Sequence, residues 1–421
     1  MTSGRRSFGW VIVAASFVLL IGSFGTQMCF GLFLKPLAEE FGWSRAGVSG
    51  AMSLLMAVAG LIGVAMGRAT DRYGARAAIA PGVVIGALSY VLMSRMDSLW
   101  EFYLLFGVGG GILAGCSYTP AVTAVSNWFG ARQRTMAIGV ALLGPVVGQM
   151  ILSPVISKVI EGAGWRTAWV VLGIVVLVSG LPALVVMGRK PVTATEAAGA
   201  DSAGDRHARP RAEGLSAGEA AKTLAFWISM VAGFVLGLGF YAFAAHIVPY
   251  ATDVGMSTTA AALILTVSSI GGAAGTLLAW AITAKLGYRW ALVVLTAMNG
   301  VAMLLFIVAG SAWAFYLLAV IVGFAFSAVV PVRMGVVPPL FGLRAIGTII
   351  GFAALAFSAG AIVGPFLAGY VFDSTASYDL AFLICGILLM IGAATLYYLR
   401  VPKANTVPEP AAIWRAGDGL E

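Results

Sequence analysis

Long apolar stretches alternate with short polar segments along most of the chain. Windows of about 20 residues without a charged side chain recur, and each can cross a hydrocarbon layer of about 30 Å at a rise of about 1.5 Å per helical residue. Backbone groups in lipid must be satisfied within their own segment, so helices are the expected element. The pattern predicts twelve spans, with ends defined to within several residues, at 9–34, 47–67, 77–94, 101–126, 136–157, 168–187, 224–250, 258–283, 290–310, 312–337, 346–371 and 378–399.

The first span follows Arg5 and Arg6, an arrangement that also begins signal peptides. It is longer than the apolar core of a signal peptide, lacks a clear cleavage site of small residues and precedes eleven further spans. We therefore expect a retained helix. Because the number of spans is even, both termini are expected on the same side of the membrane.

Composition agrees with a chain embedded in lipid. Hydrophobic residues make up 60% of the 421 residues and charged residues only 10%, and the mean hydropathy is +0.98. A soluble domain carries charge on roughly a quarter of its residues. The sequence therefore predicts an all-α, multi-pass membrane protein.

Several functional classes are not expected. No GxxxxGKS stretch occurs, which argues against an ATP-driven pump. Polar residues stand singly on different spans without a Ser, His and Asp set, so an enzyme is not expected. Cys29, Cys116 and Cys385 lie in separate spans without CxxC spacing. We therefore expect no disulfide framework, no metal and no other cofactor.

Basic residues are divided unevenly between the two sides. With the N-terminus inside, the inner segments hold 19 Lys and Arg residues and the outer loops hold five, Lys35, Arg45, Arg95, Lys158 and Arg166. Cytoplasmic loops are typically enriched in Lys and Arg. We therefore expect both termini in the cytoplasm and the chain in a cell membrane, with a bacterial inner membrane as the favoured one. The bias also explains the net charge of +8 without a nucleic-acid partner.

The chain contains an internal repeat. DRYGAR at 71–76 is answered by AKLGYR at 284–289, 213 residues later, and WFGARQRTMAIG at 128–139 by LFGLRAIGTIIG at 340–351, 212 residues later. Between the copies, 191–222 is rich in Ala, Gly and charge, which is typical of disorder. We expect two homologous six-helix halves, 1–190 and 223–400, joined by a disordered cytoplasmic linker, 191–222, and followed by a cytoplasmic tail, 401–421. Repeated halves around a central site are common in secondary transporters.

At this repeat a family resemblance emerges. GRATDRYGAR, at 67–76, resembles the loop signature of the major facilitator superfamily, which places a Gly, an Asp-Arg pair and a second Gly-x-Arg at this spacing. The resemblance covers essentially the whole chain and implies a conformational latch between spans two and three. Its residues would be Gly67, Asp71, Arg72, Gly74 and Arg76. An ordinary polar turn is the alternative.

A looser resemblance concerns the branch within that superfamily. GLFLKPLAEEFGWSRAGVS after span one and HIVPYATDVGMS after span seven are similar to bacterial monocarboxylate porters and oxalate/formate exchangers. Those relatives typically carry an Arg in span eight, where this chain has Thr276, and some carry a basic residue in span one, where it has Met28. The usual carboxylate clamp is missing, so lactate or oxalate is not carried over as substrate.

Arg333 is the charged residue that fits neither a loop nor a helix end. An ionised group costs about 2.5 to 3.5 kcal/mol at the centre of a membrane helix, so it usually faces a cavity or a partner. Pro338 and Pro339 are expected to end the helix early, which would let Arg333 reach the headgroups. An anion-contacting Arg333 and a snorkelling Arg333 both remain open.

Three spans supply further candidates for a substrate site. His246 in span seven could bind a carboxylate or carry a coupled proton, because imidazole titrates near pH 6.5, and Tyr241 about one turn earlier is a further candidate for substrate contact. Gln27 in span one and Tyr118 and Asn127 in span four could line a water-filled cavity. For each of them, hydrogen bonding within the protein is the alternative.

These features predict a secondary active transporter for a small organic anion, with a carboxylate favoured, that works by alternating access with proton symport or anion exchange. The expected partners are that small-molecule substrate, a coupling proton or counter-anion and the lipid bilayer, and the expected state is a monomer. An exporter of uncharged or amphipathic compounds is the alternative. A membrane receptor without transport is a more remote one.

Overall fold

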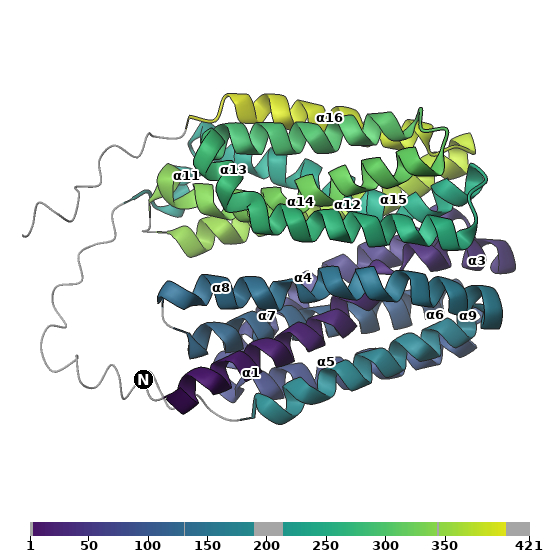
Figure 1. Cartoon of the computed structure of the whole chain (residues 1–421), viewed down its shortest axis with the longest axis horizontal. Helices are drawn as coiled ribbons and strands as arrows, with labels where there is room; N and C mark the ends of the chain where they lie inside the picture. Colours follow the sequence, from purple (N-terminus) through teal and green to yellow (C-terminus); the bar gives the residue numbers. More distant parts are fainter. Residues whose placement is uncertain (1–2, 130, 189–213, 343–344, 401–421) are drawn as a thin grey trace, which may run out of the picture.

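The computed structural model describes residues 3–129, 131–188, 214–342 and 345–400. These residues are almost entirely helical, with no strand among them, and form two bundles (Figure 1). The N-terminal bundle contains α1 (Ser3–Leu20), η1 (Ile21–Gly25), α2 (Thr26–Met28), α3 (Gly31–Phe41), α4 (Arg45–Tyr73), α5 (Ala75–Leu92), η2 (Met93–Arg95), α6 (Leu99–Phe102), η3 (Tyr103–Gly109), α7 (Gly110–Trp128), α8 (Ala131–Leu142) and α9 (Gly144–Val186). The C-terminal bundle contains α11 (Ala217–Ala220), α12 (Leu224–Asp253), α13 (Thr258–Phe306), α14 (Ala312–Phe341), α15 (Ile346–Thr375) and α16 (Asp379–Tyr397).

Ten stretches of the described chain are long and apolar enough to cross a membrane. Two of them, Met136–Val186 with 51 residues and Thr258–Phe306 with 49, are too long for one crossing of about 30 Å. Each contains a glycine with non-helical backbone angles, Gly164 in α9 and Gly287 in α13, at which one helix ends and the next begins. The ten stretches therefore accommodate the twelve crossings that the sequence predicts.

The internal repeat is visible in the backbone. Gly74, between α4 and α5, has φ 88° and ψ 161°, and Gly287, its counterpart in the second copy, has φ 73° and ψ 162°. A side chain is disfavoured at such positive φ values, which explains a glycine at both places. The two halves thus make the same turn at the same point of the repeat.

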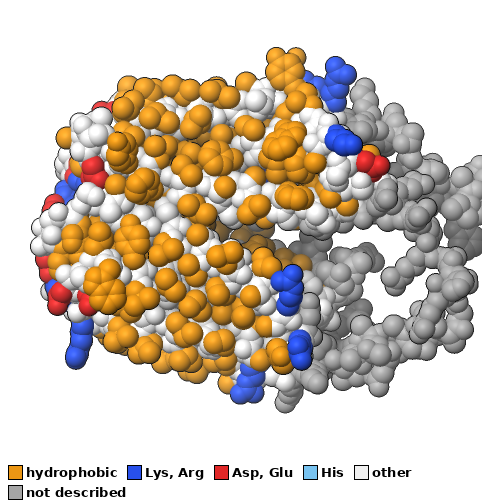
Figure 2. Space-filling model, turned by 180° about the vertical axis from the view of Figure 1, so that it is seen from behind, with side chains coloured by type: hydrophobic (Ala, Val, Ile, Leu, Met, Phe, Trp, Pro, Cys, Tyr) orange, Lys and Arg blue, Asp and Glu red, His pale blue; other side chains and the backbone are white. Residues whose placement is uncertain are grey.

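The two ends of the bundles differ in what they carry. We call the end with Gly74, Gly188, Gly214, Gly287 and Gly342 the linker end, because 189–213 connects the halves there. The opposite end, with Arg45, Gly164 and Asp253, we call the Arg45 end. Figure 2 shows an apolar belt on the visible face, with charged side chains gathered near both ends.

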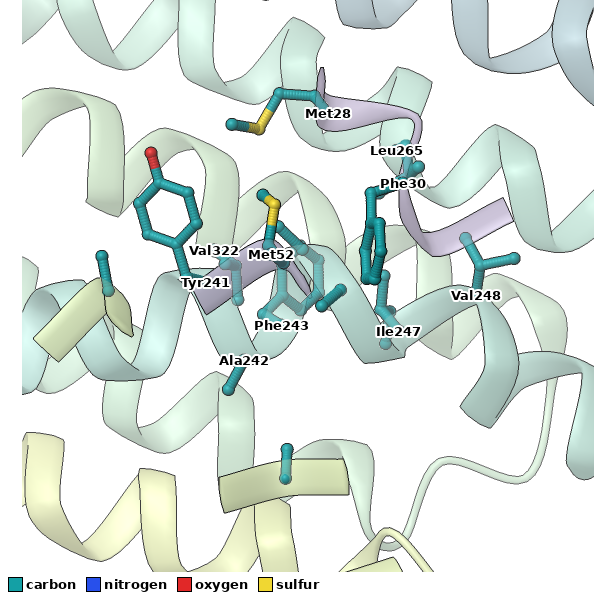
Figure 3. Close-up of a cluster of buried hydrophobic side chains, with 14 of the residues drawn as sticks. Met28, Phe30, Met52, Tyr241, Ala242, Phe243, Ile247, Val248, Leu265 and Val322 are labelled. Atoms are coloured by element: carbon teal, nitrogen blue, oxygen red, sulfur yellow. The ribbon is translucent and has the colours of Figure 1, made fainter. Parts of the chain in front are cut away.

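The halves pack tightly in the part nearer the Arg45 end. The first span is broken there into η1, α2 and α3, and Figure 3 shows Met28 and Phe30 from this break beside Tyr241, Phe243 and Ile247 of α12. These side chains belong to one buried apolar cluster shared by both halves. The cluster forms an apolar seal across the interface.

Part of the predicted disordered linker is ordered. From Gly214 onward the chain lies against the C-terminal half, where Leu215 donates its amide to the carbonyl of Phe341 at 2.8 Å. Ala220 of α11 is buried in a small apolar cluster with Phe341 and Ile349. Composition alone does not predict this contact, because few apolar residues make it and their partners are distant in sequence. The rest of the predicted linker, 191–213, and the predicted tail lie outside the described residues.

Candidate binding site

A cavity of about 610 Å³ lies between the two halves. Figure 2 shows a hollow between the bundles that faces the linker end. The N-terminal half contributes mainly small residues to its wall, and the C-terminal half contributes larger ones. The lining residues are Phe24, Ala59, Gly60, Gly63, Val64, Gly67, Ala114, Gly115, Tyr118, Thr119, Val330, Arg333, Met334, Ala353, Ala354, Phe357 and Ser358.

Arg333 is a buried cation in the wall of this cavity, with 9% of its surface exposed. Its Nη2 donates one long hydrogen bond, 3.4 Å, to the carbonyl of Ala353, and its guanidinium carbon lies 5.8 Å from the centroid of the Phe357 ring. Within the described part of the chain, no carboxylate forms an ion pair with it. The guanidinium therefore retains donors for a further acceptor.

The helix that carries Arg333 does not end where the sequence suggested. Instead of stopping before Pro338 and Pro339, α14 continues to Phe341, and Gly342 donates its amide to the carbonyl of Pro338 at 2.8 Å. Packing of Val337 and Phe341 in the small apolar cluster opposes the local preference of proline. Arg333 consequently lies two turns inside the helix, and the geometry favours the cavity-facing orientation over snorkelling.

Gly233 of α12 makes room for the guanidinium. A Cβ atom built on Gly233 would lie 2.5 Å from Nη2 of Arg333, closer than a real Cβ contact. A side chain at this position would therefore have to displace the guanidinium, whereas glycine leaves it in place. The guanidinium lies between α12 and α15, beside the cavity.

Three aromatic side chains, Phe24, Tyr118 and Phe357, contribute to the wall of the cavity. Phe24 meets Tyr118 edge-on at 5.8 Å, and Tyr241 meets Phe357 edge-on at 6.2 Å. Tyr118 is 44% exposed and lines the cavity as expected. Tyr241 does not line it, but contributes to a second, smaller cavity of about 180 Å³ that also includes Gln149.

A glycine stripe on α4 forms one wall. Gly60, Gly63 and Gly67 follow one another at helical spacing and all line the cavity. A Cβ built on Gly60 meets nothing within 4 Å, and those on Gly63 and Gly67 would lie 3.5 Å from Thr119, an ordinary contact. Packing does not demand these glycines. Their effect is to widen the cavity. Their helical spacing is visible in the sequence, but the family motif identified only Gly67.

Gln27 and Asn127 do not reach the cavity. Gln27 is 1% exposed beside the break in the first span, its Nε2 is 3.9 Å from the sulfur of Met56, and its Oε1 has no hydrogen-bond partner. Asn127 is exposed, more than two turns beyond Tyr118 on α7. In this conformation neither residue contacts the cavity, so their predicted roles in substrate binding remain predictions.

His246 is also absent from both cavities. It is fully buried, and its Nε2 is 2.8 Å from the carbonyl of Pro365 while its Nδ1 is 3.0 Å from the hydroxyl of Tyr378. Both ring nitrogens are therefore occupied by the protein. In this conformation His246 makes no contact with a cavity-bound molecule, so its expected contact with substrate is replaced by hydrogen bonds within the C-terminal half.

The Arg45 end is closed by contacts between the halves. Arg45 of α4 pairs with Asp253 of α12, and Lys35 pairs with the same carboxylate at 3.1 Å. Nη1 of Arg45 donates to the hydroxyl of Tyr378 at 2.8 Å, and its guanidinium carbon lies 3.7 Å above the centroid of the Phe372 ring. We call these residues the Arg45 gate. Thr259 adds a hydrogen bond to Glu161 at 2.8 Å.

The residues of the predicted latch lie at the linker end. Gly67 lines the cavity, and Gly74 ends α4. The guanidinium carbon of Arg72 is 5.2 Å from the centroid of the Tyr73 ring, and Arg76 lies against Gly188. The side chain of Asp71 lies outside the described residues, so its predicted role remains a prediction.

Comparison with known sequences gives one consistent result. The sequence model of the Major Facilitator Superfamily matches residues 15–257 and 229–415. Monocarboxylate transporter 11 of Mus musculus is 30% identical over 420 residues, which cover 94% of this chain and 88% of the relative. Monocarboxylate transporter 11 of Homo sapiens is 29% identical over 416 residues, which cover 94% and 83%. Monocarboxylate transporter 13 of Rattus norvegicus is 28% identical over 398 residues, which cover 93% and 89%.

The fold is similarly represented among solved structures. A bacterial homologue of the human lysosomal transporter Spinster, in an inward-facing and occupied conformation, superposes with a TM-score of 0.74 at 17% identity. The match covers 95% of this chain and 97% of the other. The same homologue in an unoccupied, inward-facing conformation gives a TM-score of 0.70 at 16% identity. At these identities the likeness concerns the fold alone.

Proposed function

Since this chain belongs to the major facilitator superfamily, and is therefore a multi-pass membrane transporter rather than an enzyme, we propose that it moves a small organic anion with a single carboxylate. The relatives named monocarboxylate transporters support carboxylate transport at modest identity. The observation that carries the proposal is Arg333, a cation in the cavity wall with no ion-pair partner among the described residues.

Electrostatics favours an anion at this place. A buried charge without a counter-charge is costly, and a carboxylate can accept two parallel hydrogen bonds from one guanidinium. Arg333 has used only one donor, in a 3.4 Å bond to Ala353. A carboxylate bound there would supply the missing counter-charge.

The remaining wall argues for an apolar body behind that carboxylate. Phe24, Phe357 and Met334 line the cavity, and its polar side chains apart from Arg333 are uncharged hydroxyls, of Tyr118, Thr119 and Ser358. A second carboxylate, or the ammonium group of an amino acid, would be desolvated without an opposite charge among the described lining residues. We therefore expect monocarboxylates with apolar or aromatic bodies to bind more tightly than dicarboxylates or amino acids.

The asymmetry of the two ends supports transport by alternating access. The Arg45 end is closed by the Arg45 gate and the apolar seal, whereas the cavity faces the linker end (Figure 2). We propose that the linker end is cytoplasmic, because it carries Arg68, Arg72, Arg76, Lys285 and Arg289, as the positive-inside pattern requires. The state described would then face inward. Coupling is by proton symport or by anion exchange, in a bacterial inner membrane.

Thermal stabilisation of the purified protein by ligands tests the substrate class, because a ligand that binds only the folded state raises its apparent stability. The panel should contain phenylacetate, lactate, succinate, phenylalanine and the uncharged analogue phenylethanol. We expect phenylacetate to stabilise the protein more than the others. Uptake of the stabilising acid by proteoliposomes should then be saturable.

Arg333→Gln supplies the matched variant for the same assay. It should abolish most of the thermal stabilisation by the carboxylate. The affinity should fall about tenfold or more, as expected for the loss of a charge-assisted hydrogen bond. Arg333→Lys, which keeps the charge but loses the planar fork, should retain part of it. An unchanged response in Arg333→Gln would remove Arg333 from the site.

The alternative is an exporter of uncharged or amphipathic compounds. Its support is the aromatic and apolar wall formed by Phe24, Phe357 and Met334. In that case phenylethanol and larger lipophilic compounds would stabilise the protein as well as phenylacetate does, and Arg333→Gln would leave their effect intact. The charge of the ligand therefore decides between the two functions.

A further inference from the structure

His246 stands at the centre of a hydrogen-bonded chain that ends in the Arg45 gate. Its Nδ1 is 3.0 Å from the hydroxyl of Tyr378, and this hydroxyl is 2.8 Å from Nη1 of Arg45. Arg45 in turn pairs with Asp253. The histidine and Tyr378 belong to the C-terminal half and Arg45 to the N-terminal half, so the chain crosses the interface that must part when the Arg45 end opens.

The chemistry of its partners fixes the protonation state of His246. The carbonyl of Pro365 can only accept, so Nε2 carries a proton and donates to it at 2.8 Å. A guanidinium can only donate, so the oxygen of Tyr378 accepts from Arg45 and its single proton is directed to Nδ1. Nδ1 must then be an unprotonated acceptor. Every donor and acceptor in the chain is satisfied only when the imidazole is neutral.

A second proton on the imidazole would disturb this arrangement. An Nδ1–H group would point at the oxygen of Tyr378, which already accepts from Arg45, and the phenolic proton would lose its acceptor. The imidazolium and the guanidinium would then be joined through one oxygen atom in a buried site, where like charges repel strongly. Arg45 belongs to the N-terminal half and His246 to the C-terminal half. Separation of the halves therefore moves the two charges apart and relieves this repulsion.

Other charged groups surround His246 and Arg45 and influence whether the Arg45 gate is open or closed. Two carboxylates hold the N-terminal half in place, one at the guanidinium of Arg45 and one at the start of α4. The titratable and charged groups in and around this hydrogen-bonded chain are Arg45 on α4, Lys35 on α3, Tyr250 and Asp253 on α12, Asp373 on α15, Tyr378 before α16 and Asp379 on α16. The carboxylates favour the closed gate, and an imidazolium opposes it.

We propose that His246 is a proton-binding site linked to the Arg45 gate, such that a proton binds preferentially when the gate is open and thereby favours the outward-open state. The orientation assumed is that of the proposed function, with the Arg45 end outside. By thermodynamic linkage, closing the gate expels the proton as strongly as the proton opens the gate. External acid would thus promote opening of the carrier to the outside.

The distance across the gate, measured as a function of pH, tests this site. Spin labels can be placed at Glu39 and Leu380, two exposed positions on opposite halves, in the full chain with its three cysteines replaced by alanine. A tenfold preference of the proton for the open state would raise the ratio of open to closed molecules by about tenfold between pH 8 and pH 5. A distance distribution that does not change over this range would overturn the proposal.

Variants separate His246 from the other titratable groups. His246→Gln keeps a donor and an acceptor but does not titrate, and should abolish the pH response while leaving the protein folded. Tyr378→Phe should weaken the closed state at all pH values, because Arg45 loses an acceptor. His207→Gln, the other histidine, and Tyr250→Phe, beside the chain but outside it, should keep the wild-type response.

The measurement needs no substrate, so its result is distinguishable from the fate of the carboxylate proposal. A pH response that persists in His246→Gln would exclude His246 even if phenylacetate is transported. Loss of the response in His246→Gln, with retention in His207→Gln, would support the proton site even if the substrate proves to be uncharged.

Discussion

The carboxylate of Asp373 accepts hydrogen bonds from the backbone amides of Arg45 and Ala46, both at 2.8 Å. The first residues of α4, in the N-terminal half, are thus capped by a side chain from α15 in the C-terminal half. Helix N-termini leave their first amides without partners inside the helix and attract negative charge. Opening of the Arg45 end must break this cap together with the ion pair between Arg45 and Asp253.

Asp373→Asn should therefore favour the open state of the Arg45 end. The amide keeps the shape of the side chain but loses the negative charge, and we expect the ratio of closed to open molecules to fall about fivefold, equivalent to about 1 kcal/mol. The spin-label pair at Glu39 and Leu380 reports this ratio. Ser374→Ala is the matched control, because the Ser374 hydroxyl bonds only to carbonyls of its own helix. Equal distance distributions in both variants would rule out the cap as part of the gate.

Gly233→Ala should impair ligand binding without a comparable loss of stability. The added methyl group would lie 2.5 Å from Nη2 of Arg333 and displace the guanidinium. We expect the affinity for a carboxylate to fall about tenfold, as for a misplaced charge-assisted hydrogen bond. Ligand-induced thermal stabilisation measures the effect. Gly351→Ala, where a Cβ meets nothing within 4 Å, serves as control and should bind as the wild type does.

Glu40, at the Arg45 end, should make the free energy of unfolding depend on pH. Its carboxylate accepts from Nε1 of Trp165 at 2.5 Å and from Arg166, and these hydrogen bonds lower the pKa of Glu40. Because the pKa is lower in the folded than in the unfolded state, the stabilisation is present above the unfolded pKa, about 4.3, and is lost as the pH falls through the folded pKa.

The variant Glu40→Gln tests this linkage. At pH 7 we expect it to be less stable than the wild type by about 0.5 to 1 kcal/mol, since the pair is exposed. The difference should shrink as the pH is lowered below about 4, because the wild-type carboxyl is then protonated too. Denaturation curves at a series of pH values measure it. A difference that stays constant down to the lowest pH would contradict the assignment.

Asp71→Asn should slow the exchange between inward and outward states more than it weakens substrate binding. The motif from Gly67 to Arg76 places Asp71 at the linker end, beyond the cavity wall. We expect the transport rate to fall by about tenfold with nearly unchanged affinity, as for a residue that affects a conformational step. Transport and binding should be measured separately on the same preparation. Full transport rate with lost affinity would place Asp71 in the binding site instead.

The features that local sequence encodes were predictable. The repeated turn at Gly74 and Gly287 follows from two copies of one motif, because positive φ favours glycine wherever it occurs. Arg333 could be singled out because a charge within a predicted span is expensive. The family resemblance was confirmed by the superfamily match along both halves.

The features that depend on distant contacts were not predictable. Whether Arg333 turns inward depends on the packing that keeps α14 helical past Pro338, and this packing comes from Phe226 and Ile349. The partners of His246 are Pro365 and Tyr378, 119 and 132 residues away, and no spacing rule connects them. Phe357 carried no signal that distinguishes a cavity wall from lipid-facing packing.

Substitutions in the glycine stripe at Gly60, Gly63 and Gly67 should change the size of the substrate that the cavity accepts. A Cβ atom can be added at these positions without a steric clash in the helix packing. Each methyl or isopropyl group placed there would subtract volume from the cavity while leaving Arg333 and its charge untouched. If the proposed function holds, a graded series from glycine through alanine to valine should restrict the carrier to progressively smaller acids.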